Sequence, residues 1–372
     1  MKSHNEIINN DKYTLLASQV IYGAYVKKAK LRELVYETYG NSSIAGATML
    51  NIYVDINSIL HPLYSEHNRV TIENITDISA GIINLCAHYR SFFRENLAVD
   101  TRFFLINSLN ICDINKKFVA EYNMNFENKV NVTQSKKIID NNMKLLEVLC
   151  PYLPAIYYIS SYQQFETAVI IANLIESLND NNPNLIISHD MYPLQLCTQY
   201  KWTSYLYPIK SRNRETGETD DISWMIPVND KINFREEFWN KYTNARKVQA
   251  GCLDRYNISP INFPLFLSLT KFTERNITGN IMSLAGAVKS IYDVVGAEDI
   301  KIDHSQLRNY PALTNGQIES RYSALDVQYI LPYYKNSPEA NNIKLLDLND
   351  IEKVNMIVSK YYRNNPIDLF KL

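Results

Sequence analysis

Two acidic residues in this sequence stand where buried strands are expected to end. Asp190 follows the apolar run at residues 184–187, and Asp55 closes a similar run at residues 50–55. In open α/β sheets, ligands bind outside the carboxyl ends of the strands, so a carboxylate at such an end marks a site. His189, beside Asp190, is either a ligand or general base of that site or a structural histidine of the turn, and we favour the structural role.

The elements that must hold these residues alternate between strands and helices. Short apolar runs predict the strands, and apolar residues at helical spacing predict the helices. This alternation predicts an α/β fold with a parallel sheet flanked by helices, and an all-helical last third packed beside it. Strands are expected at 50–55, 102–106, 155–159, 184–187, 200–209 and 222–226. Helices are expected at 13–39, 77–95 after an N-cap at Thr76, 133–149, 163–178, 194–198, 234–248, 260–270, 317–334 and 348–362.

Composition sets limits on the function classes. Apolar residues make up 46% of the 372 residues, enough for a sizeable core, and the net charge of −1 excludes a basic field over the whole protein. That balance argues against an autonomous DNA binder and suits a subunit of an assembly. The five cysteines are widely spaced, which predicts buried reduced thiols and no zinc site. No signal peptide or bilayer-spanning run is visible, so we expect a soluble intracellular protein.

Four segments, in order, resemble motifs of the flap endonuclease or 5′-nuclease family, within the PIN-like nucleases. They are Tyr53 to Leu60, Phe103 to Ser108, Phe165 to Ala172 and Ser188 to Leu196. A fifth segment, Phe272 to Gly279, is similar to the family turn before a DNA-gripping helical hairpin. The resemblance implies an N-terminal helical extension at 1–45, a PIN-like α/β domain at 46–230 and a helical region with a hairpin-like segment at 231–372.

The family uses this arrangement to hold two Mg²⁺ ions, which at roughly 4 Å apart stabilise both oxygens of a phosphodiester displacement. By this resemblance Asp55, Glu166 and Asp190 are the retained catalytic and metal-binding acids. Other residues stand where the family has Asp: Asn107, Ala168, Val169 and Tyr192. The set left could hold one Mg²⁺ ion with waters, or none.

The DNA-binding parts of the family also differ here. Met282 and Leu284 stand where the hairpin has glycines, and bulkier residues block the close approach of a backbone to phosphates. Phe272 and Arg275 replace acids in the preceding turn. Candidate nucleic-acid contacts flank the polar, arch-like segment at residues 108–132: Lys116, Lys117, Lys136 and Lys137. The alternative is that these lysines are simply solvated.

Three hypotheses follow. The first is a catalytically reduced or inactive 5′-nuclease-like protein that serves as a DNA-binding or structural subunit in a viral, bacteriophage-type assembly with protein partners, in the host cytoplasm or the virion. The second is an active Mg²⁺-dependent 5′-exonuclease or flap endonuclease acting on DNA. The third is a scaffold subunit without nucleic-acid contact.

Overall fold

The computed structural model describes most of the chain. The described residues are 14–39, 47–64, 69–71, 76–108, 113–120, 122, 134–161, 165–200, 202–212, 219–226, 260–270, 277, 281–296, 298, 300–311, 313, 315–341, 343, 345–348, 350–362, 367 and 372. The helix predicted at 234–248 and nearly all of the segment Phe272 to Gly279 lie outside these ranges.

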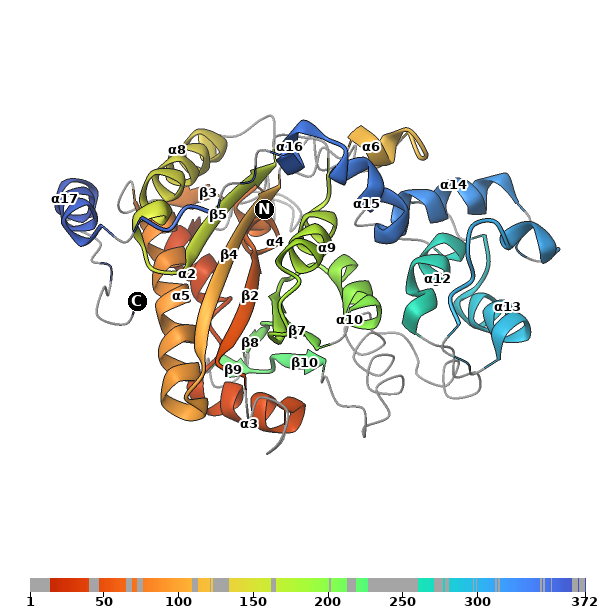
Figure 1. Cartoon of the computed structure of the whole chain (residues 1–372), viewed down its shortest axis with the longest axis horizontal. Coiled ribbons are helices and arrows are strands. Elements are labelled where there is room, and N and C mark those ends of the chain that lie inside the picture. Colours follow the sequence, from red (N-terminus) through yellow and green to blue (C-terminus); the bar gives the residue numbers. More distant parts are fainter. Residues whose placement is uncertain are drawn as a thin grey trace, which may run out of the picture.

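A six-stranded sheet with the order β10-β7-β6-β2-β4-β5 forms the centre of the molecule (Figure 1). Its first five strands along the chain pair in parallel, and β10 joins the edge antiparallel to β7. The predicted α/β fold with a parallel sheet flanked by helices is confirmed. The strands are β2 (Met49–Asp55), β4 (Asp100–Ser108), β5 (Ile156–Ser161), β6 (Asn184–Ile187), β7 (Thr203–Tyr207) and β10 (Trp224–Ile226). Two small two-stranded sheets pair β1 (Thr14–Leu16) with β3 (Arg69–Thr71), and β8 (Lys210–Arg212) with β9 (Thr219–Asp221).

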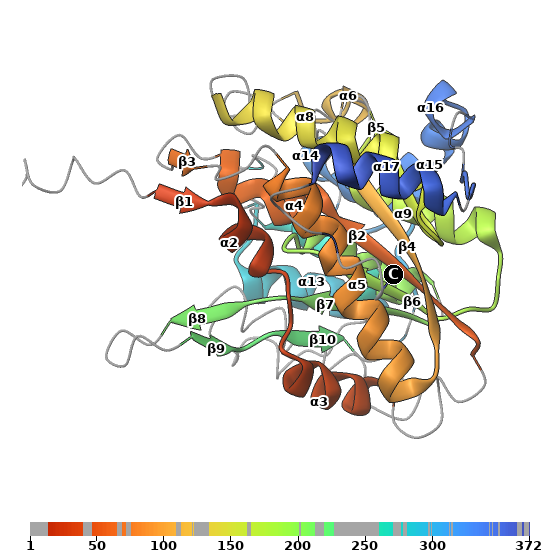
Figure 2. The ribbon, with the colours of Figure 1, turned by 90° about the vertical axis from the view of Figure 1, so that its left-hand side faces the viewer.

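The two faces of the sheet belong to two hydrophobic clusters, because successive side chains of a strand point to opposite faces. Along β2, Ile52 and Val54 lie in the first cluster and Tyr53 lies in the second. Figures 1 and 2 show the helices α5 and α8 on the first face, while α9 and α10 cover the other. Helices of the first half are α2 (Ala17–Tyr22), α3 (Lys28–Tyr39), α4 (Ile56–Leu60), α5 (Asp77–Leu97), α6 (Asp113–Lys116), α8 (Gln134–Leu149), α9 (Thr167–Leu178) and α10 (Leu196–Gln199).

The N-terminal stretch differs from its prediction. The single helix expected at 13–39 is wrong, because β1 precedes α2 and a turn at residues 23–27 separates α2 from α3. Ile21 and Leu31 are buried in the first hydrophobic cluster. A Cβ atom on Gly81 would lie 2.8 Å from Cδ1 of Ile21, so glycine permits the close packing of α5 against α2. The division of the chain at residues 45 and 230 stays a prediction.

The last third is helical in the part described, as predicted; its helices from α12 to α16 pack on the second face, whereas α17 packs on the first cluster beside α8 (Figure 1). One predicted helix is wrong, because the span 317–334 is two helices that meet at Asp326. Asp326 has extended backbone, and its carboxylate accepts the Gln328 N–H at 3.1 Å to cap the second helix. The helices are α12 (Phe263–Leu269), α13 (Leu284–Val295), α14 (Gly316–Leu325), α15 (Val327–Lys335), α16 (Pro338–Asn341) and α17 (Ile351–Tyr361). Short 3₁₀ helices cover His61–Tyr64, Cys150–Tyr152, Tyr192–Gln195, Pro260–Asn262 and Leu307–Asn309.

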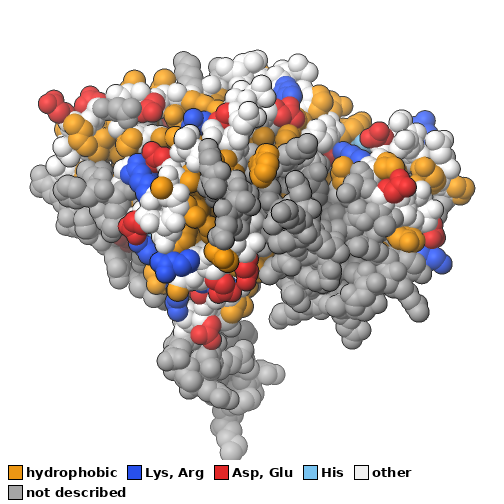
Figure 3. All heavy atoms as spheres, turned by 60° about the horizontal axis from the view of Figure 1, so that its bottom comes forward, with side chains coloured by type: hydrophobic (Ala, Val, Ile, Leu, Met, Phe, Trp, Pro, Cys, Tyr) orange, Lys and Arg blue, Asp and Glu red, His pale blue; other side chains and the backbone are white. Residues whose placement is uncertain are grey.

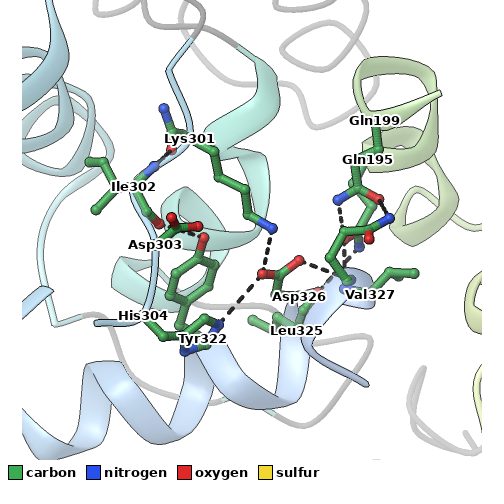
Figure 4. A network of polar contacts seen from close by, with 12 residues as sticks. Gln195, Gln199, Lys301, Ile302, Asp303, His304, Tyr322, Leu325, Asp326 and Val327 are labelled. Atoms are coloured by element: carbon green, nitrogen blue, oxygen red, sulfur yellow. Dashed lines mark hydrogen bonds and ion pairs between the residues drawn. The ribbon is translucent and has the colours of Figure 1, made fainter. Parts of the chain in front are cut away.

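Ion pairs hold the junction at Asp326, whose carboxylate is almost fully buried (Figure 4). Lys301 Nζ lies 2.7 Å and His304 Nε2 lies 3.5 Å from Oδ2 of Asp326. Burial alone would raise the pKa of Asp326, but the contacts with His304 and Lys301 outweigh it and lower the pKa. The negative charge is therefore stabilised where α14 ends and α15 begins.

Gln195 connects this helical region to the sheet. Its side chain is fully buried, donates to the backbone oxygens of Tyr192 and Leu325 at 3.2 Å each, and accepts the Val327 N–H at 3.0 Å. Figure 4 shows the amide facing the α14–α15 junction. One side chain after β6 thus satisfies backbone groups that the helix break leaves unpaired.

The described cysteines are buried free thiols, as predicted from the wide spacing of the cysteines. Cys86, Cys150 and Cys197 are free and buried, whereas Cys112 and Cys252 lie outside the described ranges. Burial raises the pKa of Cys86 to about 12, so this thiol is protonated and unreactive at neutral pH. None of the helices described is both long and apolar enough to cross a bilayer.

We predict that Gln195→Ala destabilises the protein by roughly 2 kcal/mol, because buried backbone groups of α14 and α15 lose their partners. Urea denaturation followed by circular dichroism measures the change. The matched control is Gln317→Ala on the exposed start of α14, which should change stability by less than about 0.5 kcal/mol. Equal losses in the two variants would contradict the role of Gln195.

Candidate functional site

The carboxylate of Asp55 lies at the predicted position, at the end of β2 and directly before α4. It is 2% exposed and is surrounded by hydrogen-bond donors of the chain itself. Oδ1 accepts the Ser58 N–H at 3.2 Å and the Thr167 hydroxyl at 3.3 Å, and Oδ2 accepts the Ser188 hydroxyl at 2.8 Å. Both carboxylate oxygens therefore hold elements of the fold together: α4, α9 and the turn after β6.

Asp190 belongs to the turn that follows β6. Its N–H donates to Ser188 Oγ at 2.9 Å, and its Oδ1 accepts the Tyr192 N–H at 3.0 Å, at the start of the 3₁₀ helix. The Tyr205 hydroxyl closes the turn from β7, 2.9 Å from the Ser188 carbonyl oxygen and 2.5 Å from that of Asp190. The polar atoms of this turn are thus engaged in fixing its shape.

Glu166 stands directly before α9, not inside it, so the helix predicted at 163–178 begins later than expected, at Thr167. The Glu166 side chain is 1% exposed, and its Oε1 accepts the Tyr122 hydroxyl at 2.8 Å. Tyr122 comes from the segment that the sequence predicts as an arch-like loop. The third acid is therefore also bonded to a side chain of this protein.

The positions at which the family has further acids are packed. Ala168, Val169 and Tyr192 are fully buried and belong to the second hydrophobic cluster. Asn107 is 8% exposed, and its Nδ2 donates to the Tyr158 hydroxyl at 2.8 Å. An unpaired carboxylate could not be accommodated at the apolar positions without a large desolvation cost.

Hydrogen bonds from the chain itself already engage the acids that would hold a metal ion. A hard cation needs several oxygen ligands, usually carboxylates. Each oxygen of Asp55 already accepts a hydrogen bond from the chain, and so does Oε1 of Glu166. Among the residues described, no three His, Cys, Asp or Glu side chains gather in a group that could hold a metal ion. The use of Asp55, Glu166 and Asp190 as Mg²⁺ ligands stays a prediction.

His189 follows β6, and its ring lies 5.9 Å from that of Tyr207 between centroids. Burial lowers the pKa of His189 to about 4, although hydrogen bonds at Ser58 and Pro208 act in the opposite direction. The imidazole is therefore neutral at pH 7. The backbone N–H of His189 donates to Ser58 Oγ at 3.0 Å, so this residue belongs to the hydrogen-bond network around Asp55.

The four lysines proposed as nucleic-acid contacts form two pairs, one at the end of α6 and one in α8. Lys116 ends α6 with its Nζ 3.8 Å from Oδ1 of Asp113, and Lys117 follows it and is exposed. Lys136 and Lys137 lie in α8, where Lys137 is exposed and the side chain of Lys136 is outside the description. Figure 1 draws α6 and α8 well apart. Their contact with nucleic acid stays a prediction.

The sequence analysis missed the donors that surround the acids. Ser58 follows Asp55 by three residues and Ser188 precedes Asp190 by two, spacings at which serine and aspartate commonly bond to nearby backbone. Only the bond of Ser58 to Asp55 was within reach of local pattern rules. Thr167, Tyr122 and Ser188 reach their acids only through the tertiary fold.

Two solved structures are similar to this one. The T5 D15 protein co-crystallized with metal ions has a TM-score of 0.44 and 12% identity, over 85% of this chain and all 100% of that chain. The T5 5′-exonuclease with bound zinc has a TM-score of 0.43 and 12% identity, over 84% of this chain and 98% of that chain. No family model matches the chain, and no curated protein matches its sequence.

We predict that Ser188→Ala destabilises the protein by roughly 2 kcal/mol, because it leaves Oδ2 of Asp55 without its nearest described donor in a buried setting. Chemical denaturation measures the loss. Ser305→Ala, on an exposed turn, removes the same atom and should be neutral within about 0.5 kcal/mol. A Ser188→Ala variant as stable as Ser305→Ala would show that the network does not support the fold.

The lowered pKa of His189 also predicts a pH dependence of stability. In the unfolded chain His189 has its ordinary pKa of 6.5, whereas in the folded protein its pKa is about 4. The contribution of the neutral His189 to the free energy of unfolding is therefore complete above pH 6.5. It falls by on the order of 3 kcal/mol as the pH drops toward 4. Denaturation curves recorded at several pH values between 7.5 and 4.5 give the free energy of unfolding at each pH. This free energy should fall less with decreasing pH in His189→Gln than in the wild type. Identical pH dependence would contradict the assignment.

Proposed function

We propose that this chain is a flap-endonuclease-like protein that does not cleave nucleic acid and acts as a binding or structural component of a larger assembly. The observation that carries the proposal is the state of Asp55. Its two oxygens accept hydrogen bonds from Ser58, Thr167 and Ser188, inside the fold. A catalytic carboxylate would keep oxygens directed at a metal or substrate.

Phosphodiester cleavage by this class of fold depends on metal ions that neutralise charge on the attacking and leaving oxygens. A substitute for that charge would have to come from the protein. The nearby cationic candidate, His189, has a lowered pKa of about 4 and is neutral at pH 7. The residues at the strand ends are therefore better suited to stabilising the fold than to catalysing phosphodiester cleavage.

The surface charges favour a component of an assembly over an autonomous DNA binder. The net charge is −1, and two lysines near the start of the described chain sit in ion pairs. Lys28 Nζ lies 2.9 Å from Glu95, and Lys30 Nζ lies 2.6 Å from Glu33. In Figure 3, blue and red side chains lie side by side on the described part of this face. Pairs of this kind leave little net field to attract a phosphate backbone.

A cleavage assay tests the proposal. Purified protein is incubated with 5′-flap and 5′-overhang DNA in the presence of Mg²⁺ or Mn²⁺, alongside Asp190→Ala and Asp55→Asn variants. We expect no metal-dependent cleavage by any of the three proteins. Cleavage by the wild type that both variants lose would replace this proposal with an active metal-dependent 5′-nuclease.

A further inference from the structure

The outer edge of β5 borders a groove. β5 is the last strand of the six-stranded sheet, and no strand in the described ranges pairs with its outer side. A cavity of about 360 Å³ is lined by all residues from 156 to 160 of this strand. Since alternate side chains of a strand point to opposite faces, a cavity that touches consecutive residues lies along the edge.

The opposite wall of the groove comes from the chain between α16 and α17. Ile343 and Leu346 of this connection line the cavity, and Figure 1 shows the connection passing beside β5. It is tied down where the Leu348 N–H donates to the carbonyl oxygen of Pro151 at 2.8 Å. The groove thus has a strand edge on one side and a fixed apolar wall on the other.

An unpaired strand edge offers a row of backbone donors and acceptors to an extended chain. Protective devices of edge strands are lysine, proline and bulges, and the β5 sequence, Ile-Tyr-Tyr-Ile-Ser-Ser, contains neither lysine nor proline. Apolar side chains next to the groove are also exposed, with Leu346 at 46%, Leu348 at 54% and Val148 at 53%. Among the described residues, no strand occupies this edge.

The charges around the groove are negative. Glu147 and Glu339 line it, and Oε2 of Glu339 accepts the Ser161 hydroxyl at 2.6 Å, which holds that carboxylate beside the strand. Asp347 stands next to Leu346 in the apolar wall. Burial raises the pKa of Tyr157 and the negative charge of Asp347 raises it further, while Arg102 and Arg90 act in the opposite direction.

We propose that this groove binds an extended segment of a partner protein, in which apolar and basic residues alternate, as an added strand on β5. Main-chain hydrogen bonds to the strand edge would supply affinity, and the alternate side chains would supply specificity. Apolar side chains of the segment pack on Ile343, on the second face of the sheet, and its basic side chains face Glu147 of α8, on the first face. A second copy of this chain is a poor occupant, because edge-to-edge pairing would bring two acidic rims together.

Binding at β5 does not depend on whether the strand ends cleave nucleic acid, so the two proposals fail independently. The test uses the full chain and three fluorescein-labelled peptides in fluorescence anisotropy. One peptide alternates valine and lysine, the second alternates valine and glutamate, and the third has the first composition arranged as a valine block and a lysine block. We expect the alternating lysine peptide to bind at least about tenfold more tightly than the others. Equal binding of the alternating and block peptides would overturn the proposal, because charge alone would then explain it.

Charge reversal locates the site. The double variant Glu147→Lys and Asp347→Lys alters exposed residues at the groove. It should weaken the binding of the alternating lysine peptide by about tenfold. Glu298→Lys combined with Asp293→Lys makes the same charge change at the exposed end of α13 and should leave binding unchanged. Hydrogen exchange should show peptide-dependent protection of the β5 amides. Equal effects of the two double variants on peptide binding would contradict the proposal, and so would the absence of peptide-dependent protection in β5. A concentration-dependent dimer that protects β5 without peptide would also contradict it.

Discussion

The fold depends on one buried carboxylate at the end of the central strand. A charge that is nearly removed from solvent is tolerated only if hydrogen bonds replace the lost water. Asp55 receives these bonds from Ser58 in the next helix, Thr167 at the start of α9 and Ser188 after β6. These three elements are thereby fixed at one point, at the carboxyl end of the central strands of the sheet. The same bonds engage the oxygens that a metal ion would need.

The stretch from Ser188 to Gln195 extends this constraint to the rest of the chain. At its start, Ser188 bonds to Asp55, and at its end the Gln195 amide satisfies backbone groups at the break between α14 and α15. A few residues after β6 thus join the sheet to the helical last third. Between them, Met191, Tyr192 and Leu194 belong to the second hydrophobic cluster.

Pattern rules predicted the elements whose signals are local and left the rest open. The strand at 184–187 and the helix α8 could be predicted because an apolar run and helical spacing are properties of neighbouring residues. The break at Asp326 could not, because it depends on Lys301 and Gln195, which lie far away in sequence. The acids of the strand ends were visible in the sequence, but their partners were not. Whether a carboxylate is open or engaged is a tertiary property.

Hydrogen bonds from the chain itself engage Asp55, Glu166 and Asp190, and we propose that no metal ion binds these acids. The most direct measurement is anomalous diffraction from crystals of the protein soaked in Mn²⁺. We predict that no anomalous peak lies within coordination distance of Asp55, Glu166 or Asp190, and that Ser188 Oγ remains hydrogen-bonded to Asp55. A Mn²⁺ ion that bridges these carboxylates, with Ser188 displaced, would contradict the account.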